Sequence, residues 1–226
     1  MNYKVNVIYL NYLNKDYAGK PFQTIKMQQD VDIEILEINQ IGFSKAINIG
    51  MKHYFEENNA DHVIVCSNDI ELPQGAFRRM MDNFVAIPET GLIGIHCVQS
   101  LPPMDMKNGQ QIHPSYSVFG TLLISRAVYE KVGYWNEEQD PYGINDADYF
   151  YRIKLAGLYN YYIHGFQANH LREDVGDGSE YRKMKDDGLA KANATLDRWL
   201  PIYDAGNYYL PYNQEGIYQK LKAENG

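Results

Sequence analysis

Short apolar segments that end abruptly in polar residues alternate along this chain with segments of helical periodicity, and this alternation limits the fold more than any other feature. Residues 5–10 and 62–67 are typical of buried strands, whereas the apolar positions of residues 42–55 recur at helical spacing. Strands that alternate with helices usually form a mostly parallel sheet covered by helices. We therefore expect an α/β protein, and 226 residues fit one domain.

The remaining elements follow from the same periodicities. The expected strands are residues 5–10, 31–38, 62–67, 92–98, 118–125 and 159–163, and the expected helices are residues 42–55, 73–84, 126–132, 145–156 and 181–200. A polar loop is expected at 101–114, an acidic, glycine-rich loop at 173–179, and an irregular aromatic tail after residue 201.

Composition excludes several classes of protein. The formal net charge of −8 argues against nucleic acid as the main ligand, although a metal ion could still bridge acidic residues to a small phosphate ligand. No basic segment leads into a long apolar run, and no apolar stretch approaches the length of a membrane span. We therefore expect a cytoplasmic protein without a transmembrane segment, and peripheral contact with a membrane is still compatible with this expectation. Cys66 lies in an apolar run and is expected to be a buried free thiol.

Tyrosine is unusually frequent, with 20 residues, and many of them lie late in the chain. Because tyrosine combines an apolar ring with a polar tip, such a cluster suits a sugar-binding or partner surface, but ordinary packing explains it equally well. The late cluster consists of Tyr203, Tyr208, Tyr209, Tyr212 and Tyr218.

Ser67, Asn68 and Asp69 directly follow an expected strand. In open α/β sheets ligands bind at the carboxyl ends of strands, where a short acid can reach a divalent ion on a diphosphate. Taken alone, a strand-end Asx turn explains the triplet better. His170 also follows a strand and could bind the same kind of ion, although most single histidines are not metal ligands.

Two acids, Asp146 and Asp148, stand at the start of the helix expected from residue 145. With Asn145 as the N-cap, Asp148 would complete a capping box and could also pair with Arg152 one turn later. Residues two apart on a helix point in divergent directions. Asp148 therefore has a plausible structural role, and Asp146 is the better candidate for a catalytic base.

Residues 39–50 place Gly42 immediately before a helix, where the backbone can approach an anionic or nucleoside group. The segment matches neither a P-loop nor GxGxxG, and a tight turn before a core helix explains it as well.

The order of these signals is more specific than any one of them. Residues 120–126 (Gly-Thr-Leu-Leu-Ile-Ser-Arg) and 132–137 (Val-Gly-Tyr-Trp-Asn-Glu) stand between the strand-end acid and the Asp-x-Asp-Tyr of residues 146–149, and a histidine follows. Residues 3–172 thus resemble the inverting GT-A glycosyltransferases of family 2, particularly their rhamnosyltransferase-like and galactofuranosyltransferase-like members.

This resemblance implies a GT-A fold, with a mostly parallel, Rossmann-like sheet, and assigns the candidate residues. Asp69 matches the last acid of the DxD motif and His170 a further ligand of Mn²⁺ or Mg²⁺, while Asp146 matches the general base. The implied donor-binding residues are Asn11, Glu37, Gly42, Lys45, Asn48, Asn68, Asp69 and Gly120, and the implied acceptor-binding residues are Trp135, Tyr142 and Asp148.

Two departures from the family pattern stand out. Ser67 replaces the first DxD acid. Residues 14–38 leave room for one strand where two are common, and Glu37 would then take the place of the acid that contacts the nucleobase of the donor. Residues 1–98 would bind the nucleotide sugar, 99–172 would carry the acceptor and catalytic residues, and 173–226 would add the loop, a helix and the tail.

The sequence thus predicts a metal-dependent transfer of a sugar from a nucleotide donor, with UDP as the default, to a glycan hydroxyl. The alternative is a non-catalytic carbohydrate-binding protein on a degenerate GT-A fold. A nucleotidyltransferase is disfavoured, because the residues after the first strand, from Leu10 to Asn14, lack a basic, glycine-rich loop.

Overall fold

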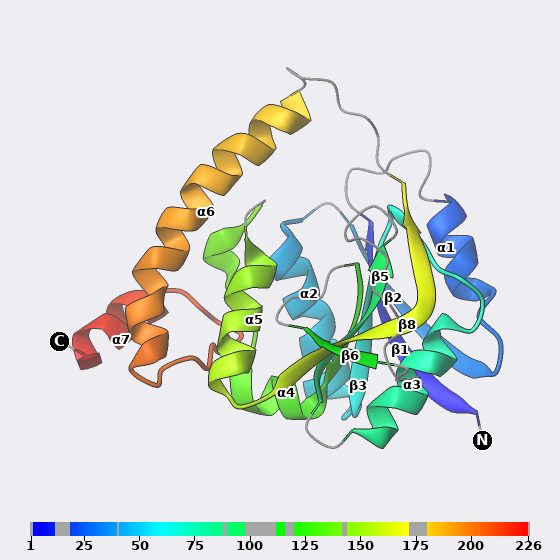
Figure 1. The fold of residues 1–226 in the computed structure, drawn as a ribbon. Helices are drawn as coiled ribbons and strands as arrows, with labels where there is room; N and C mark the ends of the chain where they lie inside the picture. Colours follow the sequence, from blue (N-terminus) through cyan, green and yellow to red (C-terminus); the bar gives the residue numbers. More distant parts are fainter. Residues whose placement is uncertain are drawn as a thin grey trace.

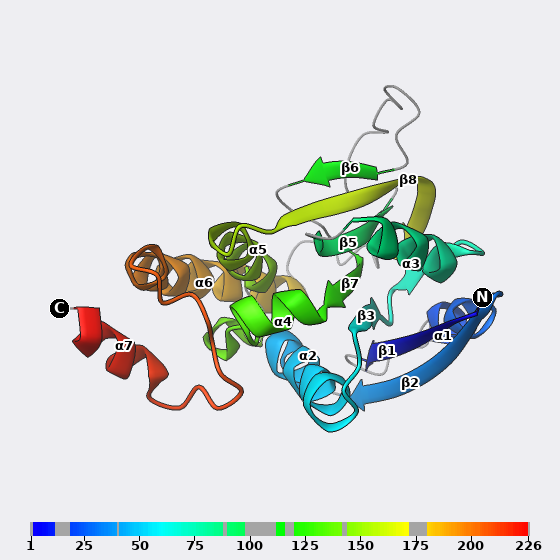
Figure 2. The same cartoon turned by 90° about the horizontal axis from the view of Figure 1, so that it is seen from below.

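The computed structural model describes residues 2–11, 19–39, 41–87, 90–97, 112–115, 120–141, 144–171 and 180–225. One eight-stranded sheet runs through the molecule in the order β2-β1-β3-β7-β5-β8-β4, with β6 paired to β8 (Figures 1 and 2). The parallel strands are β1 (Tyr3–Asn11), β2 (Val31–Asn39), β3 (His62–Ser67), β5 (Thr90–Cys97) and β8 (Tyr159–His170). The antiparallel strands are β4 (Ile70–Glu71), β6 (Ile112–Ser115) and β7 (Thr121–Ser125).

Helices cover both faces of this sheet. They are α1 (Gly19–Lys26), α2 (Phe43–Met51), which continues as a π-helix η2 (Lys52–Glu57), α3 (Ala76–Ala86), α4 (Arg126–Val132), the 3₁₀ turn η3 (Glu137–Gln139), α5 (Asn145–Leu155), α6 (Glu180–Asp204) and α7 (Ile217–Asn225). Within the described ranges, no helix is both long enough and apolar enough to cross a membrane.

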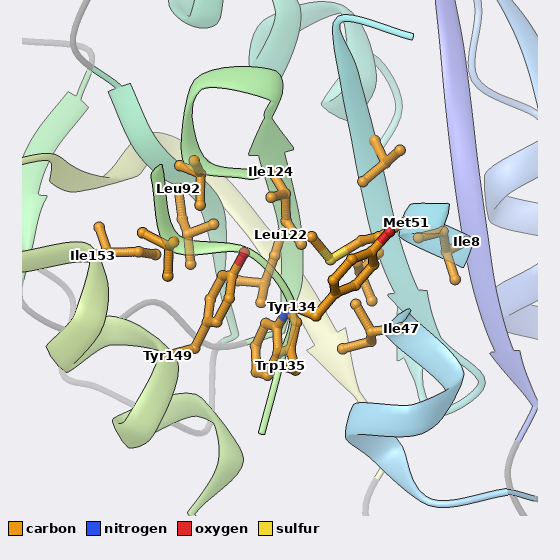
Figure 3. Close-up of a cluster of buried hydrophobic side chains, with 14 of the residues drawn as sticks. Ile8, Ile47, Met51, Leu92, Leu122, Ile124, Tyr134, Trp135, Tyr149 and Ile153 are labelled. Carbon is orange, nitrogen blue, oxygen red and sulfur yellow. The ribbon is translucent and has the colours of Figure 1, made fainter. Parts of the chain in front are cut away.

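Strand β1 shows why the sheet has a core on each side. Ile8 and Leu10 join the apolar cluster beneath α2, α4 and α5, whereas Val7 and Tyr9 join the cluster beneath α1 and α3. Successive side chains of a strand point to opposite faces, so a strand that is apolar at every position must be buried on both. Figure 3 shows the first cluster, which includes Trp135.

The predicted α/β class, the mostly parallel sheet and all six expected strands are confirmed within the described residues, and the main differences lie at the ends of elements. Helix α1 was not expected, because it is short and buries only Pro21 and Ile25. Strand β8 continues beyond the expected residue 163 to His170, and β6 begins within the expected loop at 101–114 and ends one residue beyond it. Both additions come from strand pairing, which periodicity does not reveal.

The carboxyl-terminal segment forms a further layer against α5, so the expectation of a wholly irregular tail is wrong, and of its described residues only 205–216, between α6 and α7, lie outside a helix. Helix α6 continues past Pro201 to Asp204, and Trp199, Tyr203 and Leu210 pack in a third apolar cluster. The backbone of Leu210 pairs with Val132 and Tyr134 on either side of Gly133.

Gly133 is required at this contact. Its φ is +73°, and a Cβ there would lie 2.0 Å from the carbonyl oxygen of Leu210.

The late tyrosines fall into two groups. Tyr203 is fully buried in the third cluster, whereas Tyr209 and Tyr212 remain exposed.

Candidate active site at the carboxyl edge of the sheet

Three of the predicted donor-binding residues meet at the carboxyl ends of adjacent parallel strands. The Asn11 amide at the end of β1 donates to Glu37 Oε1 of β2 over 2.8 Å. Asn68, just after β3, donates to Asn11 Oδ1 over 3.1 Å. These contacts bring Asn11, Glu37 and Asn68 together in one polar row, as expected for parallel strands that end at one edge.

Asp69 and His170, the two predicted metal ligands, are also brought together. Strand β4 pairs with β8 so that Ile70 lies opposite His170, and the Leu171 N–H donates to the Asp69 carbonyl over 2.7 Å. Asp69 Oδ2 lies 3.0 Å from His170 Nε2, and the Ser67 hydroxyl donates to Asp69 Oδ1 over 2.5 Å. Both side chains stay accessible, with 32% of Asp69 and 24% of His170 exposed.

The electrostatics of this pair favour a carboxylate. Burial alone would raise the pKa of Asp69, but hydrogen bonds with His170 and Ser67 outweigh it and hold the pKa below its usual value. An accessible carboxylate beside an imidazole fits Mn²⁺ or Mg²⁺, ions that commonly take one or two protein ligands and complete their coordination with substrate phosphates and water. The described residues contain no group of three or more His, Cys, Asp or Glu side chains arranged for a metal.

Helix α5 begins at the same edge, which lies at the top of the sheet in Figure 1. Asp146 is partly buried, and its Oδ1 accepts the backbone N–H of Ala147 over 2.8 Å. Burial raises the pKa of Asp146, and this hydrogen bond offsets only part of the shift. A carboxylate with a raised pKa is a stronger base than an exposed one.

The predicted capping by Asn145 is wrong. The residue before the helix is Ile144, which provides no side-chain hydrogen bond, and Asn145 is the first helical residue. The Asn145 amide instead donates to Ser44 Oγ over 2.6 Å and to Asp140 Oδ1 over 3.1 Å. Asn145 therefore ties the start of α5 to the start of α2.

Asp148 has the structural role that the sequence indicated. Its carboxylate accepts from Arg152 Nε over 2.8 Å, and both side chains are 0% exposed. Asn136 and Tyr203 donate to the other carboxylate oxygen over 3.1 and 2.9 Å. The predicted acceptor contact of Asp148 is thus corrected, because no surface of the side chain can reach a substrate.

Trp135 is corrected for the same reason, since its side chain is 0% exposed. Its ring stacks on Tyr149 with centroids 4.3 Å apart (Figure 3) and meets Phe43 edge to face. Trp135 is therefore a core residue between α2 and α5. The third predicted acceptor residue, Tyr142, and the acidic loop at 173–179 lie outside the described residues.

The start of α2 is already occupied by a carboxylate from this chain. Asp140 accepts the backbone N–H groups of Ser44 and Lys45 over 2.8 and 2.9 Å. A Cβ at Gly42 would lie 2.4 Å from the Asp140 carboxylate. The predicted approach of a donor to Gly42 is therefore corrected: the glycine makes room for Asp140.

Asn48 is also buried and structural. Its amide donates to the Trp135 carbonyl and to Glu137 Oε1, both over 2.9 Å, and its oxygen accepts the Trp135 N–H over 2.8 Å. The predicted donor contact of Asn48 is corrected by this complete set of partners. The Lys45 side chain remains exposed, and Gly120, with φ +93°, stands just before β7 at the carboxyl edge of the parallel strands.

Sequence reasoning missed Asp140, which joins the two helix starts. It follows η3 and precedes Pro141, a position without any periodic or motif signal. Only the tertiary contact with α2 reveals its role.

No protein-family model matches this chain, and no curated protein matches it by sequence. Solved structures do. S. aureus TarS 1-349, in complex with UDP-GlcNAc, superposes with a TM-score of 0.58 at 12% identity, over 100% of this chain and 71% of TarS 1-349.

Two further structures are similar. The catalytic domain of Drosophila beta1,4-galactosyltransferase 7, in complex with xylobiose, has a TM-score of 0.51 and 18% identity over 80% of this chain and 79% of that one. A197 from STIV has a TM-score of 0.53 and 12% identity over 75% and 86%. The fold of this chain is that of the GT-A glycosyltransferases, as the resemblance implied.

Proposed function

We propose that this protein is an inverting glycosyltransferase that moves a sugar from a nucleotide-diphosphate donor, with UDP as the default nucleotide, to a hydroxyl of a glycan. The observation that carries the proposal is the pairing of Asp69 with His170, 3.0 Å apart at the carboxyl edge of a GT-A sheet. In addition, TarS was solved with UDP-GlcNAc and beta1,4-galactosyltransferase 7 with xylobiose.

The donor would lie along the polar row. Asn11, Glu37 and Asn68 offer hydrogen-bonding groups for the nucleoside at the ends of β1, β2 and β3. Asp69 and His170 would hold Mn²⁺ or Mg²⁺ against the diphosphate. When bound, such an ion neutralises the charge that develops on the leaving diphosphate. The net charge of −8 makes such an ion useful, because the chain otherwise repels an anionic donor.

Asp146 would act as the general base. Its carboxylate takes the proton of the acceptor hydroxyl while the oxygen attacks the anomeric carbon from the face opposite the leaving diphosphate, and this geometry inverts the configuration. The raised pKa of Asp146 suits proton abstraction, and the Asn145 contacts hold the start of the helix in place.

Calorimetric titration of UDP tests the metal pair directly. UDP should bind more tightly with Mn²⁺ present, and His170→Ala should remove most of that gain while leaving metal-free binding unchanged. His53→Ala is a matched control, because this partly exposed histidine lies on η2. Equal Mn²⁺-dependent affinity in the wild type and in His170→Ala would refute the assignment.

A non-catalytic carbohydrate-binding protein is the second candidate. The observation in its favour is Ser67, which stands where the family has a metal-binding acid and instead donates a hydrogen bond to Asp69. A panel of UDP-sugars incubated with Mn²⁺ and analysed for released UDP separates the two candidates. Release that Asp69→Asn abolishes supports the enzyme, whereas binding of glycans without any release supports the alternative.

A further inference from the structure

A pocket of about 610 Å³ lies between the start of α2, the turn η3 and residues 212–215. Lys45, Glu137 and Glu138 line one side, and Tyr212 and the following residues line the other. The volume is within the range of pockets that bind small molecules, and it suits one or two sugar rings. None of the contacts of the donor site described above uses this pocket.

The side of the pocket that residues 212–215 form is held in place by specific contacts. Gln214 Oε1 accepts the Glu137 N–H over 3.0 Å, and Gln214 Nε2 donates to the Trp135 carbonyl over 2.7 Å. The Tyr212 ring meets Tyr134 edge to face with centroids 5.2 Å apart, and Lys52 Nζ lies 4.6 Å from its centroid. The wall is therefore organised before any ligand arrives, which lowers the cost of binding.

The lining decides the class of ligand. Three carboxylates, those of Glu137, Glu138 and Glu215, line the pocket. Three cations balance them: Lys45 in the lining, Arg198 in an ion pair with Glu138, and Lys52 over the Tyr212 ring. A pocket without an excess of positive charge gives the phosphates of a nucleotide no electrostatic advantage, so a neutral ligand fits it better. Carboxylate and amide groups beside a partly exposed tyrosine ring are instead the groups that bind sugar hydroxyls and the apolar faces of sugar rings.

The lining of the pocket is also linked to the start of α5. The Lys45 N–H donates to Asp140, and Asp140 accepts from Asn145, the residue before Asp146. A chain of two hydrogen bonds thus links the lining of the pocket to the helix start that carries the base.

We propose that this pocket binds the neutral glycan acceptor, with Tyr212 and Glu215 as contact residues. The inference rests on the proposed glycosyl transfer, since it assigns the acceptor subsite of that reaction. The carboxyl-terminal layer would then serve recognition as well as stability.

Saturation-transfer NMR with neutral disaccharides tests the pocket without turnover. The probes are xylobiose, lactose, maltose and chitobiose, each titrated into the full chain. At least one should bind the wild type, and Tyr212→Ala and Glu215→Lys should each weaken its affinity at least tenfold. Glu224→Lys, at an exposed position on α7 outside the pocket, is the matched control and should bind as the wild type does.

UDP titration in the same variants separates this inference from the proposed function. Disaccharide binding that is absent in the wild type, or unchanged in both pocket variants, overturns the pocket assignment even if UDP still binds with Mn²⁺. Disaccharide binding that depends on Tyr212 and Glu215 supports the pocket even if Mn²⁺-dependent UDP binding fails. Glu215→Lys keeps the test decisive if Tyr212→Ala fails to fold, because Glu215 is exposed.

Discussion

The starts of α2 and α5 point to the same edge of the sheet, and each has an aspartate at its backbone N–H groups, but the two acids differ in their partners. Asp140 reaches α2 from another segment and accepts from Ser44, Lys45 and Asn145. Asp146 belongs to α5 itself and accepts the N–H of the next residue, Ala147. A carboxylate at a helix start can therefore join two segments, as Asp140 does, or bond only within its own helix, as Asp146 does. The number and origin of its hydrogen-bond donors distinguish the two cases.

The pair Asp146 and Asp148 repeats this contrast within a single helix turn. Asp148 is enclosed by Arg152, Asn136 and Tyr203, whereas Asp146 is only partly buried. Asp148, whose side chain is 0% exposed, is therefore the structural residue of the two. The predictions below test this division from the largest expected effect to the smallest.

Arg152→Met should have the largest effect on stability. It leaves the Asp148 carboxylate buried without its partner, and breaking such a pair costs about 3–5 kcal/mol. Chemical denaturation followed by circular dichroism measures the loss. Arg78→Met is the control, because Arg78 and Asp82 also form an i,i+4 pair, in the reverse order and with 37% and 45% of the side chains exposed. Its loss should cost at most about 1 kcal/mol. Equal effects would contradict the structural role of Asp148.

Asp146→Asn should affect rate rather than stability. Loss of a general base lowers turnover by about 10²–10⁴-fold, while UDP affinity should stay unchanged. Because burial disfavours the charged carboxylate, the free energy of unfolding at pH 7 should be equal to or higher than that of the wild type. Initial rates of UDP release and a denaturation curve measure both quantities, and wild-type turnover would remove Asp146 from the mechanism.

Gly42→Ala should destabilise the junction of the two helix starts. The new Cβ takes the place of the Asp140 carboxylate, and loss of these hydrogen bonds costs about 1–3 kcal/mol. Asp140→Ala should cost a similar amount, and the double variant should cost less than the sum of the two. Additive effects in this double-mutant cycle would show that Gly42 and Asp140 act independently. Gly19→Ala is the control, because a Cβ there meets no atom within 4 Å.

The smallest expected effect is a difference in pH dependence. A group whose pKa is raised by folding binds its proton more tightly in the folded state, so its contribution to stability is favourable at low pH and declines as pH rises from the unfolded toward the folded pKa. That decline should disappear in Asp146→Asn. In the wild type, the acid limb of the rate should lie above the ordinary aspartate pKa of about 3.9. A limb at or below that value would contradict a buried base.

Much of the fold could be predicted from the sequence because the sheet is buried on both faces. A fully apolar strand such as residues 62–67 needs no tertiary information to be recognised. The polar strand ends were equally visible, and the structure brings together Asn11, Glu37 and Asn68, and also Asp69 and His170. Parallel strands end at one edge whatever the lengths of their connections, and this regularity makes strand-end residues predictable.

The tertiary structure alone decided what happens at the helix starts and along the carboxyl-terminal segment. The roles of Asp140, Asn48 and Trp135 depend on contacts with segments far away in the chain. The periodicity of the sequence carries no information about such contacts. The sequence by itself determined the α/β class, the carboxyl ends of β1, β2 and β3 and the Asp148–Arg152 pair, because each depends on local spacing. Packing between segments far apart in the chain determined that Asn136 and Tyr203 enclose Asp148 and that Asp140 joins the starts of α2 and α5.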